Sequence, residues 1–305
     1  MKSKTYIIGA GAIGKALAVA LNVSGQQVEL IRGSVLNKPT VKSSLKAIHH
    51  GEALEAEVPI STLDKYESLD GIVVITIKSF GNGILAERLR HKVGDTPVVL
   101  LQNGLGIEKP YLENHIKNLF RCILFVSSQI ESDAVSYRPV RPSAIGQIAG
   151  TADLQSVVSQ LNCQYFPFTE DQNIQEIIWK KAMANSVFNS ICPLIEANNN
   201  IFSENEAAMK MAVSVVDECI GVAAKNGINL NIDEMKELIL MMSSNSGGQY
   251  ISTYQDIENG RQTEIDTLNL EIVRIAESIG MGEEVKITRL LGQLTKLKSE
   301  LSMTG

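Results

Sequence analysis

The first half of the chain alternates short apolar runs with segments whose apolar residues have helical spacing. Residues 5–8 form an apolar run that predicts a strand, and the Ala- and Leu-rich segment 13–22 predicts the helix that follows it. Further strands are predicted at residues 27–31, 71–77, 96–101 and 122–127. Continuous apolar runs are typical of strands buried on both faces of a parallel sheet with helical crossovers. The pattern therefore predicts a doubly wound α/β sheet.

The second half of the chain has a different pattern. Residues 134–150 contain two prolines and several small residues, which favour antiparallel strands or hairpins at the sheet edge. Helical spacing of apolar residues then recurs at residues 174–194, 204–226, 233–242 and 263–279. The candidate C-terminal stops of these helices are Gly227, Gly280 and Gly282. Because 305 residues exceed the usual single-core domain, we predict an α/β domain over residues 1–170 and an all-helical domain over residues 171–305.

Composition and charge exclude several classes of protein. Hydrophobic residues make up 44% and charged residues 20%, as in ordinary globular proteins. The net charge of -6 lacks the basic excess that nucleic-acid binding needs. The four cysteines form no CxxC pair and the chain has only four histidines, so we expect reduced core cysteines and no metal site. The first apolar run is too short for a signal peptide or a membrane span, which predicts a cytoplasmic protein with no membrane partner.

A glycine-rich motif lies between the first predicted strand and the first predicted helix. It consists of Gly9, Ala10, Gly11, Ala12, Ile13 and Gly14. Glycines here permit a tight turn, a close approach of backbone to a pyrophosphate and close helix packing, while the helix N-terminus presents amide donors to the anion. Because the motif stands inside a strand-turn-helix unit, we interpret it as the dinucleotide-binding loop of a Rossmann-type domain rather than a structural glycine turn.

The end of the second predicted strand indicates which dinucleotide is bound. An NAD site usually offers an acidic residue about 20 residues after the glycines, to accept hydrogen bonds from the ribose. This chain instead has Arg32 and Ser34. A guanidinium and a hydroxyl suit a 2′-phosphate, so we predict that residues 1–170 bind NADPH/NADP. The alternative is that Arg32 is a solvated loop residue and that Glu29, inside the strand, binds the ribose.

Two more strand ends are candidate site loops. Lys78 follows the strand predicted at 71–77, and Asn103 with Gly104 follows the strand predicted at 96–101. Ligands of open α/β sheets bind outside the carboxyl ends of the strands, which favours both positions. The alternatives are that Lys78 is an exposed loop lysine and that Asn103 and Gly104 form an ordinary turn.

The helix predicted at 174–194 carries a narrow polar stripe. Lys181, Asn185 and Asn189 are spaced by four residues, and each step turns about 400°, so the three side chains share one face of the helix. Lys180 points about 100° away from that face. Because the rest of the helix is apolar almost all round, the stripe either lines a cavity or forms a solvated face.

A second polar cluster lies at residues 252–266 and includes Ser252, Glu264 and Asp266. Thr263 and Glu264 by themselves also fit a helix start, where the helix dipole favours acidic residues in the first turn. That interpretation covers Asp266 at least.

These features together resemble, in order and spacing, the ketopantoate reductase family, also called the 2-dehydropantoate 2-reductase family. The resemblance rests on the glycine motif, Arg32, the loop from Asn103, the lysine-asparagine stripe and residues 252–266, and it spans nearly the whole chain. It implies an N-terminal Rossmann domain and a C-terminal helical domain. It also implies NADPH-dependent reduction of 2-dehydropantoate to pantoate, on the route to pantothenate and coenzyme A.

The resemblance also implies roles for single residues. Lys181 would be the general acid and Glu264 a catalytic or substrate-orienting carboxylate. The residues that would hold substrate oxygens are Asn185, Asn189 and Ser252, and those near the nicotinamide and ribose are Lys78 and Asn103. The chemistry agrees, because an ammonium group can stabilise the charge that develops on the keto oxygen and can supply its proton.

Two other functions stay open at this point. A related NADP-dependent oxidoreductase would act on another small 2-keto acid with the same lysine, and a non-catalytic NADPH-binding regulator would keep only the glycine loop. The long helices from residue 204 onward could supply a homodimer surface.

Overall fold

The computed structural model describes residues 4–131 and 133–304. The chain divides into two compact units, which are described separately. Unit 1 comprises the residues up to Gln102 together with Ile107–Ile174, and unit 2 comprises Asn103–Gly106 together with the residues from Gln175 onward. The short loop Asn103–Gly106 therefore belongs to unit 2, although both of its sequence neighbours belong to unit 1.

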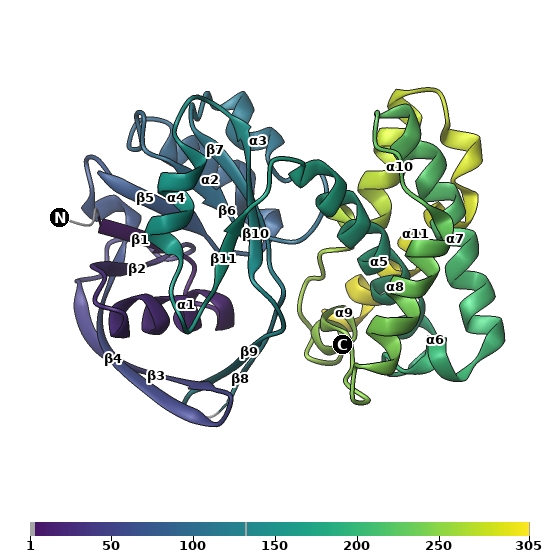
Figure 1. The fold of residues 1–305 in the computed structure, drawn as a ribbon, viewed down its shortest axis with the longest axis horizontal. Helices are drawn as coiled ribbons and strands as arrows, with labels where there is room; N and C mark the ends of the chain where they lie inside the picture. The colour runs from purple at the N-terminus through teal and green to yellow at the C-terminus, as the bar shows by residue number, and fades with distance from the viewer. Residues whose placement is uncertain (1–3, 132, 305) are drawn as a thin grey trace. The chain divides into compact units, whose positions relative to one another are not determined.

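One sheet organises the described part of unit 1 (Figure 1). Its strands are β1 (Lys4–Ile8), β2 (Val28–Arg32), β3 (Val41–His49), β4 (Glu52–Thr62), β5 (Gly71–Ile75), β6 (Val98–Leu100), β7 (Leu119–Ile123), β8 (Val126–Ile130), β9 (Val135–Pro139), β10 (Ser143–Ala149) and β11 (Phe168–Glu170). Their spatial order is β11-β10-β7-β6-β5-β1-β2-β4-β3-β9-β8. The centre, β2-β1-β5-β6-β7, is parallel throughout. The doubly wound α/β prediction is confirmed.

Apolar side chains alternate between two cores, one on each face of the sheet. Ile7 on β1 packs into the core that contains α1 (Ala12–Val23), whereas its neighbour Ile8 packs into the opposite core with the helix α2 (Asn82–Leu89). Both isoleucines are fully buried. Strands buried on both faces read as continuous apolar runs, which is why this part of the sheet was predictable. The remaining helices of unit 1 are α3 (Lys109–Glu113) and α4 (Leu154–Leu161).

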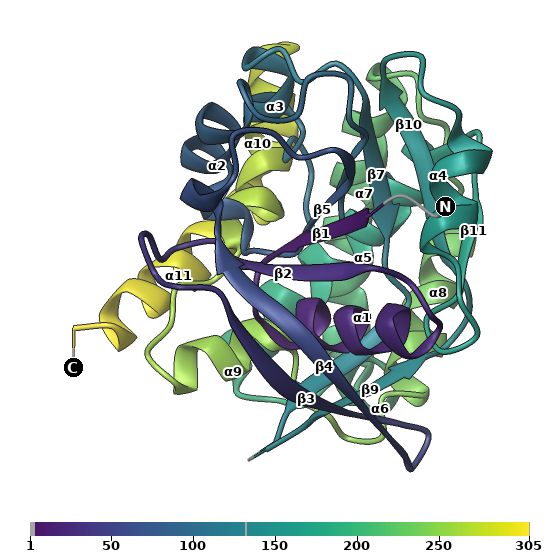
Figure 2. The same cartoon turned by 90° about the vertical axis from the view of Figure 1, so that its left-hand side faces the viewer.

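The outer strands β3, β4, β8 and β9 all contact α1, and β3, β4 and β9 curl around it (Figure 2). The sequence patterns above did not predict the hairpin of β3 and β4, where buried and exposed residues alternate along β4. The single strand predicted at residues 122–127 is wrong. β7 ends at Ile123 and β8 begins at Val126, because β7 pairs with β6 and β10 whereas β8 pairs with β9; between them the Phe125 amide donates to the Ser143 hydroxyl at 3.1 Å.

The described part of unit 2 is helical, as predicted. Its α-helices are α5 (Ile174–Ile195), α6 (Ile201–Glu204), α7 (Glu206–Lys225), α8 (Ile232–Ser244), α9 (Ser252–Glu258), α10 (Asn269–Ser278) and α11 (Lys286–Ser302). Asparagine caps begin two of them: the Asn205 side chain accepts from the Ala208 amide, and the Asn231 side chain accepts from the Asp233 and Glu234 amides.

Two details of the helix prediction need correction. The helix predicted to begin at residue 263 begins at Asn269, because a short 3-10 turn, Ile265–Thr267, precedes it and Leu268 leaves helical backbone angles. Gly227 and Gly280 do follow helix ends with positive φ angles of 78° and 76°. Gly282 does not end a helix, since it starts the 3-10 turn Gly282–Glu284.

The states of the cysteines agree with the reduced thiols expected from the sequence. All four are free thiols, and Cys122, Cys192 and Cys219 are buried while Cys163 is half-buried. Among the described residues, no helix combines the length and the apolar character that a membrane span requires.

Candidate active site

Two motif glycines are required by the packing of unit 1 itself. Gly9 has φ +128°, and a Cβ there would lie 2.5 Å from the Thr76 hydroxyl oxygen. A Cβ at Gly14 would lie 1.9 Å from the Gly9 carbonyl oxygen. Thr76 closes the arrangement, because its hydroxyl donates to the Gly9 carbonyl at 3.0 Å. The turn after β1 and the start of α1 can therefore meet only where side chains are missing.

Gly11 differs from both. Its backbone angles, φ -79° and ψ -171°, suit any residue, and a Cβ placed there would meet no atom of the described residues within 4 Å apart from those of its chain neighbours. Gly11 is also the N-cap of α1, whose first turn carries no acidic residue. The space over the N-terminus of α1 is thus open and faces amide donors and the positive end of the helix dipole, which fits the pyrophosphate of a dinucleotide.

β2 carries both residues that the sequence offered as alternatives for binding the ribose, Glu29 and Arg32. The Glu29 carboxylate is buried, lies 2.5 Å from the Lys4 ammonium and accepts from the Tyr66 hydroxyl. Burial alone would raise the pKa of Glu29, but these partners, with Ser61, hold it below its ordinary value. Glu29 is therefore a structural carboxylate, whereas half-buried Arg32 ends the strand.

A second cation lies beside the loop that follows Arg32. The Arg88 guanidinium on α2 lies 3.4 Å from the Gly33 carbonyl oxygen. The sequence offered no signal for it, because Arg88 is 55 residues from Gly33 and reads as an ordinary helix arginine.

The two strand-end candidates fall in different units. Lys78 is exposed at the end of the segment after β5, in unit 1. Asn103 begins the loop that belongs to unit 2, where the Leu105 amide donates to the Thr267 carbonyl at 2.7 Å. A Cβ on Gly104, which has φ +103°, would lie 2.5 Å from the Thr267 hydroxyl and 2.7 Å from its carbonyl oxygen. Gly104 is thus required by close packing as well as by its turn.

The polar stripe of α5 is tied to the start of α9. Asn185 and Asn189 are 9% and 4% exposed, so this part of the stripe is not a solvated face. The Asn189 amide nitrogen donates to the Asn185 carbonyl at 2.9 Å. Its oxygen accepts from the Thr253 hydroxyl at 2.7 Å and lies 3.4 Å from that of Ser252. The structure therefore brings three of the predicted substrate residues together, with Thr253 as a neighbour that the sequence interpretation missed.

The two adjacent lysines of α5 have different surroundings. Lys180 forms ion pairs with Glu176 at 2.8 Å and Glu234 at 3.2 Å, and hydrogen bonding to Glu176 raises its pKa. Lys181 is half-buried and lies on the same face of the helix as Asn185. The face assignment made from helical spacing thus separates a lysine in a carboxylate cluster from one on the asparagine stripe.

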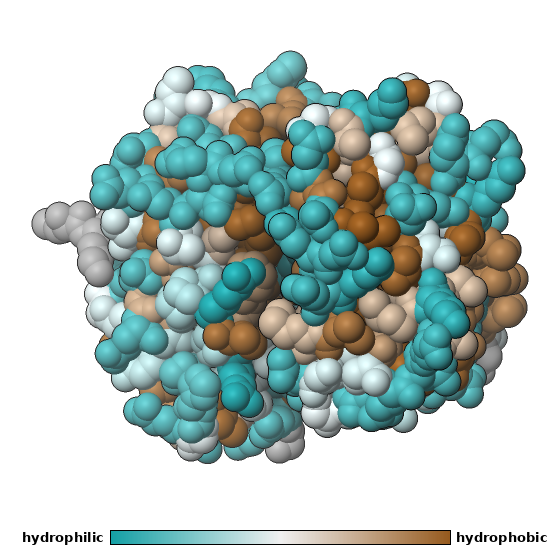
Figure 3. Space-filling model, turned by 45° about the vertical axis from the view of Figure 1, so that its right-hand side comes forward, coloured by the Kyte–Doolittle hydropathy of each residue, from teal (hydrophilic) through white to brown (hydrophobic). Residues whose placement is uncertain are grey.

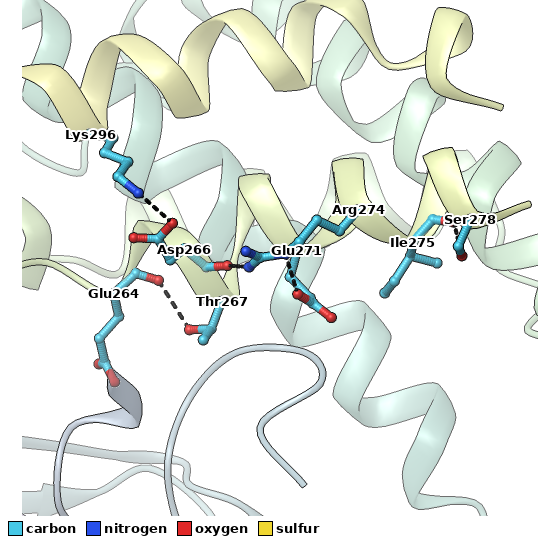
Figure 4. Close-up of polar contacts among 8 residues, drawn as sticks. All are labelled: Glu264, Asp266, Thr267, Glu271, Arg274, Ile275, Ser278 and Lys296. Carbon is cyan, nitrogen blue, oxygen red and sulfur yellow. Dashed lines mark hydrogen bonds and ion pairs between the residues drawn. The ribbon is translucent and has the colours of Figure 1, made fainter. Parts of the chain in front are cut away.

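Glu264 precedes the 3-10 turn and is linked to the loop of Asn103 through Thr267. The Thr267 amide and hydroxyl donate to the Glu264 carbonyl at 3.0 and 3.1 Å. The neighbouring carboxylate has a structural role, since Asp266 pairs with Lys296 at 2.9 Å. Figure 4 shows the Glu264 carboxylate pointing away from that pair.

The residues of unit 2 offer an ammonium, amides, hydroxyls and a carboxylate, which are groups suited to a small oxygen-rich acid. Residues 4–131 and 133–304 contain no cluster of three His, Cys, Asp or Glu side chains placed to hold a metal ion.

Fold and glycine loop together define a Rossmann-type protein with a helical C-terminal part. Two family models match this chain: "Ketopantoate reductase PanE/ApbA" over residues 5–145 and "Ketopantoate reductase PanE/ApbA C terminal" over residues 173–299. The chain belongs to the ketopantoate reductase family, an oxidoreductase family.

Relatives and solved structures are similar to this chain over nearly its full length. The chain is 30% identical to a 2-dehydropantoate 2-reductase of Pyrococcus abyssi, with 98% of each chain covered. It is similar to a D-mandelate dehydrogenase solved with NADH and anilino(oxo)acetate, at TM-score 0.85 and 24% identity over 98% of this chain and 99% of that one. A dimeric ketopantoate reductase from Staphylococcus aureus is similar at TM-score 0.82 and 18% identity, over 98% and 99%.

Proposed function

We propose that this protein reduces 2-dehydropantoate to pantoate with NADPH, a step of pantothenate and coenzyme A formation. The observation that carries the proposal is the buried stripe of Asn185 and Asn189 continuing from Lys181 on one helix face, in a member of this family. Residues 1–170 are proposed as the NADP-binding domain and residues 171–305 as the substrate and catalytic domain.

The cofactor assignment rests on unit 1. The open space at Gly11 and the amides of α1 suit a pyrophosphate, and the guanidinium of Arg32 suits a 2′-phosphate. Lys78 and Asn103 are proposed near the ribose and nicotinamide. When bound, NADPH supplies the hydride that reaches C2 of the keto acid.

The residues of unit 2 would hold the substrate and manage its proton. The Lys181 ammonium donates a proton to the keto oxygen as charge develops there, and the protein donors stabilise that charge. The side-chain amide of Asn189 donates one N–H to the Asn185 backbone carbonyl, and its oxygen accepts from the Thr253 hydroxyl. These two bonds fix the orientation of the amide and therefore the direction of its second N–H. Asn185, Asn189 and Ser252 hold the carboxylate and hydroxyl oxygens, and Glu264 orients the substrate or Lys181.

Steady-state loss of NADPH absorbance with 2-dehydropantoate tests the proposal, and Lys181→Ala is the decisive variant. We expect turnover to fall by about 10²–10⁴-fold, the range for a lost general acid, while NADPH binding stays close to that of the wild type. Lys180→Ala is the matched control, since it removes the adjacent lysine from its carboxylate cluster and should keep most activity. Full turnover in the Lys181 variant would remove Lys181 from the mechanism.

A second candidate is an oxidoreductase for another small 2-keto acid, favoured by the likeness to the D-mandelate dehydrogenase solved with NADH. A panel of 2-keto acids, each assayed with NADPH and with NADH, separates the two. Turnover of any of them eliminates the third candidate, a non-catalytic NADPH-binding regulator.

We also propose a homodimer. Four leucines on α11 are exposed and recur with spacings of four, three and four residues, which places them on one face: Leu290, Leu294, Leu297 and Leu301. Figure 3 shows hydrophobic patches between hydrophilic residues on one face of the molecule. Sedimentation of the wild type and of Leu294→Glu measures the oligomeric state directly.

A further inference from the structure

A buried network of polar side chains lies in unit 1 beside the segments that follow β5 and β6. It joins Asn82 at the start of α2, Gln102 after β6 and Tyr111 on α3, which are 2%, 6% and 0% exposed. The amides of Asn82 and Gln102 bond to each other in both directions, at 2.5 and 3.2 Å. The Tyr111 hydroxyl donates to the Asn82 oxygen at 3.1 Å. Each of these three side chains is thus hydrogen-bonded to another member of the network in a low-dielectric interior.

The network also holds two backbone carbonyls. The Gln102 amide donates to the Ile77 carbonyl at 2.9 Å, and the Asn82 amide donates to the Ile107 carbonyl at 3.1 Å. Ile77 directly precedes Lys78, whereas Gln102 and Ile107 stand on either side of the loop Asn103–Gly106. The same pair of amides therefore fixes both strand-end segments that carry candidate cofactor residues.

This network is continuous with the glycine loop. Ile77 follows Thr76, whose hydroxyl donates to the Gly9 carbonyl at 3.0 Å. β5 lies between β1 and β6 in parallel register, so the ends of the three strands are adjacent at one edge of the sheet. A displacement of Ile77 would be passed to Thr76 and to the turn that precedes α1.

We propose that Asn82 and Gln102 are positioning residues for the cofactor. They set the backbone of the segments that carry Lys78 and Asn103 without touching the cofactor. This inference rests on the proposed function, in that it takes the glycine loop to bind NADPH. The neutral amide pair suits the role, because each side chain carries both donors and an acceptor. The two side chains can therefore hydrogen-bond to each other and still donate to two backbone carbonyls.

The control for a merely structural role is another buried asparagine of unit 1. Asn118 is 7% exposed and makes a comparable set of bonds: it donates to the Asp95 carbonyl at 2.7 Å and accepts from the Thr151 and Ala152 amides at 2.9 and 3.0 Å. It precedes β7 and therefore lies at the opposite, amino-terminal edge of the sheet. Asn82→Ala and Asn118→Ala remove the same kind of group from the two edges.

The experiment measures the Kd for NADPH by fluorescence titration of full-length protein, alongside the urea midpoint of each variant. We expect both variants to lose stability, but only Asn82→Ala to weaken NADPH binding, by about tenfold or more, since tenfold corresponds to about 1.4 kcal/mol, roughly the contribution of one hydrogen bond. Tyr111→Phe removes one bond and leaves both carbonyls gripped, so its Kd should stay within about twofold of the wild type. If Asn82→Ala does not fold, Gln102→Met removes the grip on Ile77 at similar chain length and should raise the Kd in the same way.

Equal Kd values for Asn82→Ala, Gln102→Met and the wild type overturn the inference, as does an equal weakening in Asn118→Ala. The readout is binding rather than turnover. A wild-type protein that binds NADPH but does not reduce 2-dehydropantoate therefore contradicts the proposed function and leaves this comparison valid.

Discussion

The substitution Gly11→Ala separates a glycine kept for the protein from a glycine kept for a ligand. Gly11 has backbone angles that alanine adopts freely, and among residues 4–131 and 133–304 only its chain neighbours would lie within 4 Å of the added methyl. Nothing in the fold of unit 1 therefore requires glycine there. If the position serves the close approach of a pyrophosphate, the methyl group would occupy the space that the phosphate needs.

Gly11→Ala should change stability and NADPH affinity in opposite directions. Replacing glycine by alanine at compatible angles reduces the entropy of the unfolded chain and stabilises a protein by about 0.4–1 kcal/mol. The urea midpoint of Gly11→Ala should therefore be unchanged or higher than that of the wild type. The affinity for NADPH should fall by roughly 10–100-fold, which corresponds to about 1.4–2.8 kcal/mol.

Gly14→Ala is the contrasting variant from the same motif. Its Cβ would lie 1.9 Å from the Gly9 carbonyl oxygen, so the backbone of the turn must move. We expect a loss of at least about 3 kcal/mol in the free energy of unfolding, although alanine is the better helix former. Urea denaturation followed by circular dichroism measures this loss, and NADPH titration of the folded protein measures binding.

The two results together test the interpretation of the loop. A Gly11→Ala protein that is as stable as the wild type and binds NADPH equally well would falsify the assignment of this loop to the cofactor. A destabilised Gly11→Ala protein would instead show that the methyl group meets protein atoms, contrary to the geometry.

Two further predictions concern charges of unit 1. Arg32→Gln should lower NADPH affinity by about tenfold or more and change NADH affinity much less, because only NADPH carries the 2′-phosphate; equal losses in paired titrations would place Arg32 elsewhere. Glu29→Gln should remove a pH-dependent part of the stability. The partners of Glu29 hold its pKa below the ordinary value of 4.5, so its contribution is complete above that pH and is lost as the pH falls through the folded pKa. Urea midpoints at pH 7 and pH 4 should therefore differ more in the wild type than in the variant, and an equal pH dependence contradicts this account.

Local periodicity was enough to predict much of the candidate site. A four-residue spacing on a helix puts Lys181, Asn185 and Asn189 on one face whatever surrounds the helix. The hydrogen-bond partner of Asn189 could not be predicted in this way, because Thr253 lies 64 residues further along the chain. The sequence interpretation singled out its neighbour Ser252 instead. The sequence holds both hydroxyls but no local signal for which of them reaches the amide.

The same limit applies to the boundaries of elements. Buried residues alternate with exposed ones along β4, a period-two signal in the sequence that could have predicted the hairpin of β3 and β4. The start of α10 had no such signal. Apolar spacing continues back through Ile265, and the helix is interrupted where the Thr267 carbonyl accepts from the Leu105 amide, a partner far away in the chain.

The amino-acid sequence by itself determined the alternation of central strands and helices in the first half of the chain, the helical character of the second half, the glycine loop after β1 and the face shared by Lys181, Asn185 and Asn189. These depend on backbone geometry over a few residues, which repeats with a fixed period. Only the tertiary structure decided which glycines the protein itself requires, that Glu29 is held by Lys4 and Tyr66, and that Asn82 and Gln102 grip two strand ends. Those properties depend on which atoms approach one another across the fold, and residues distant in sequence carry no mark of the partners they will meet.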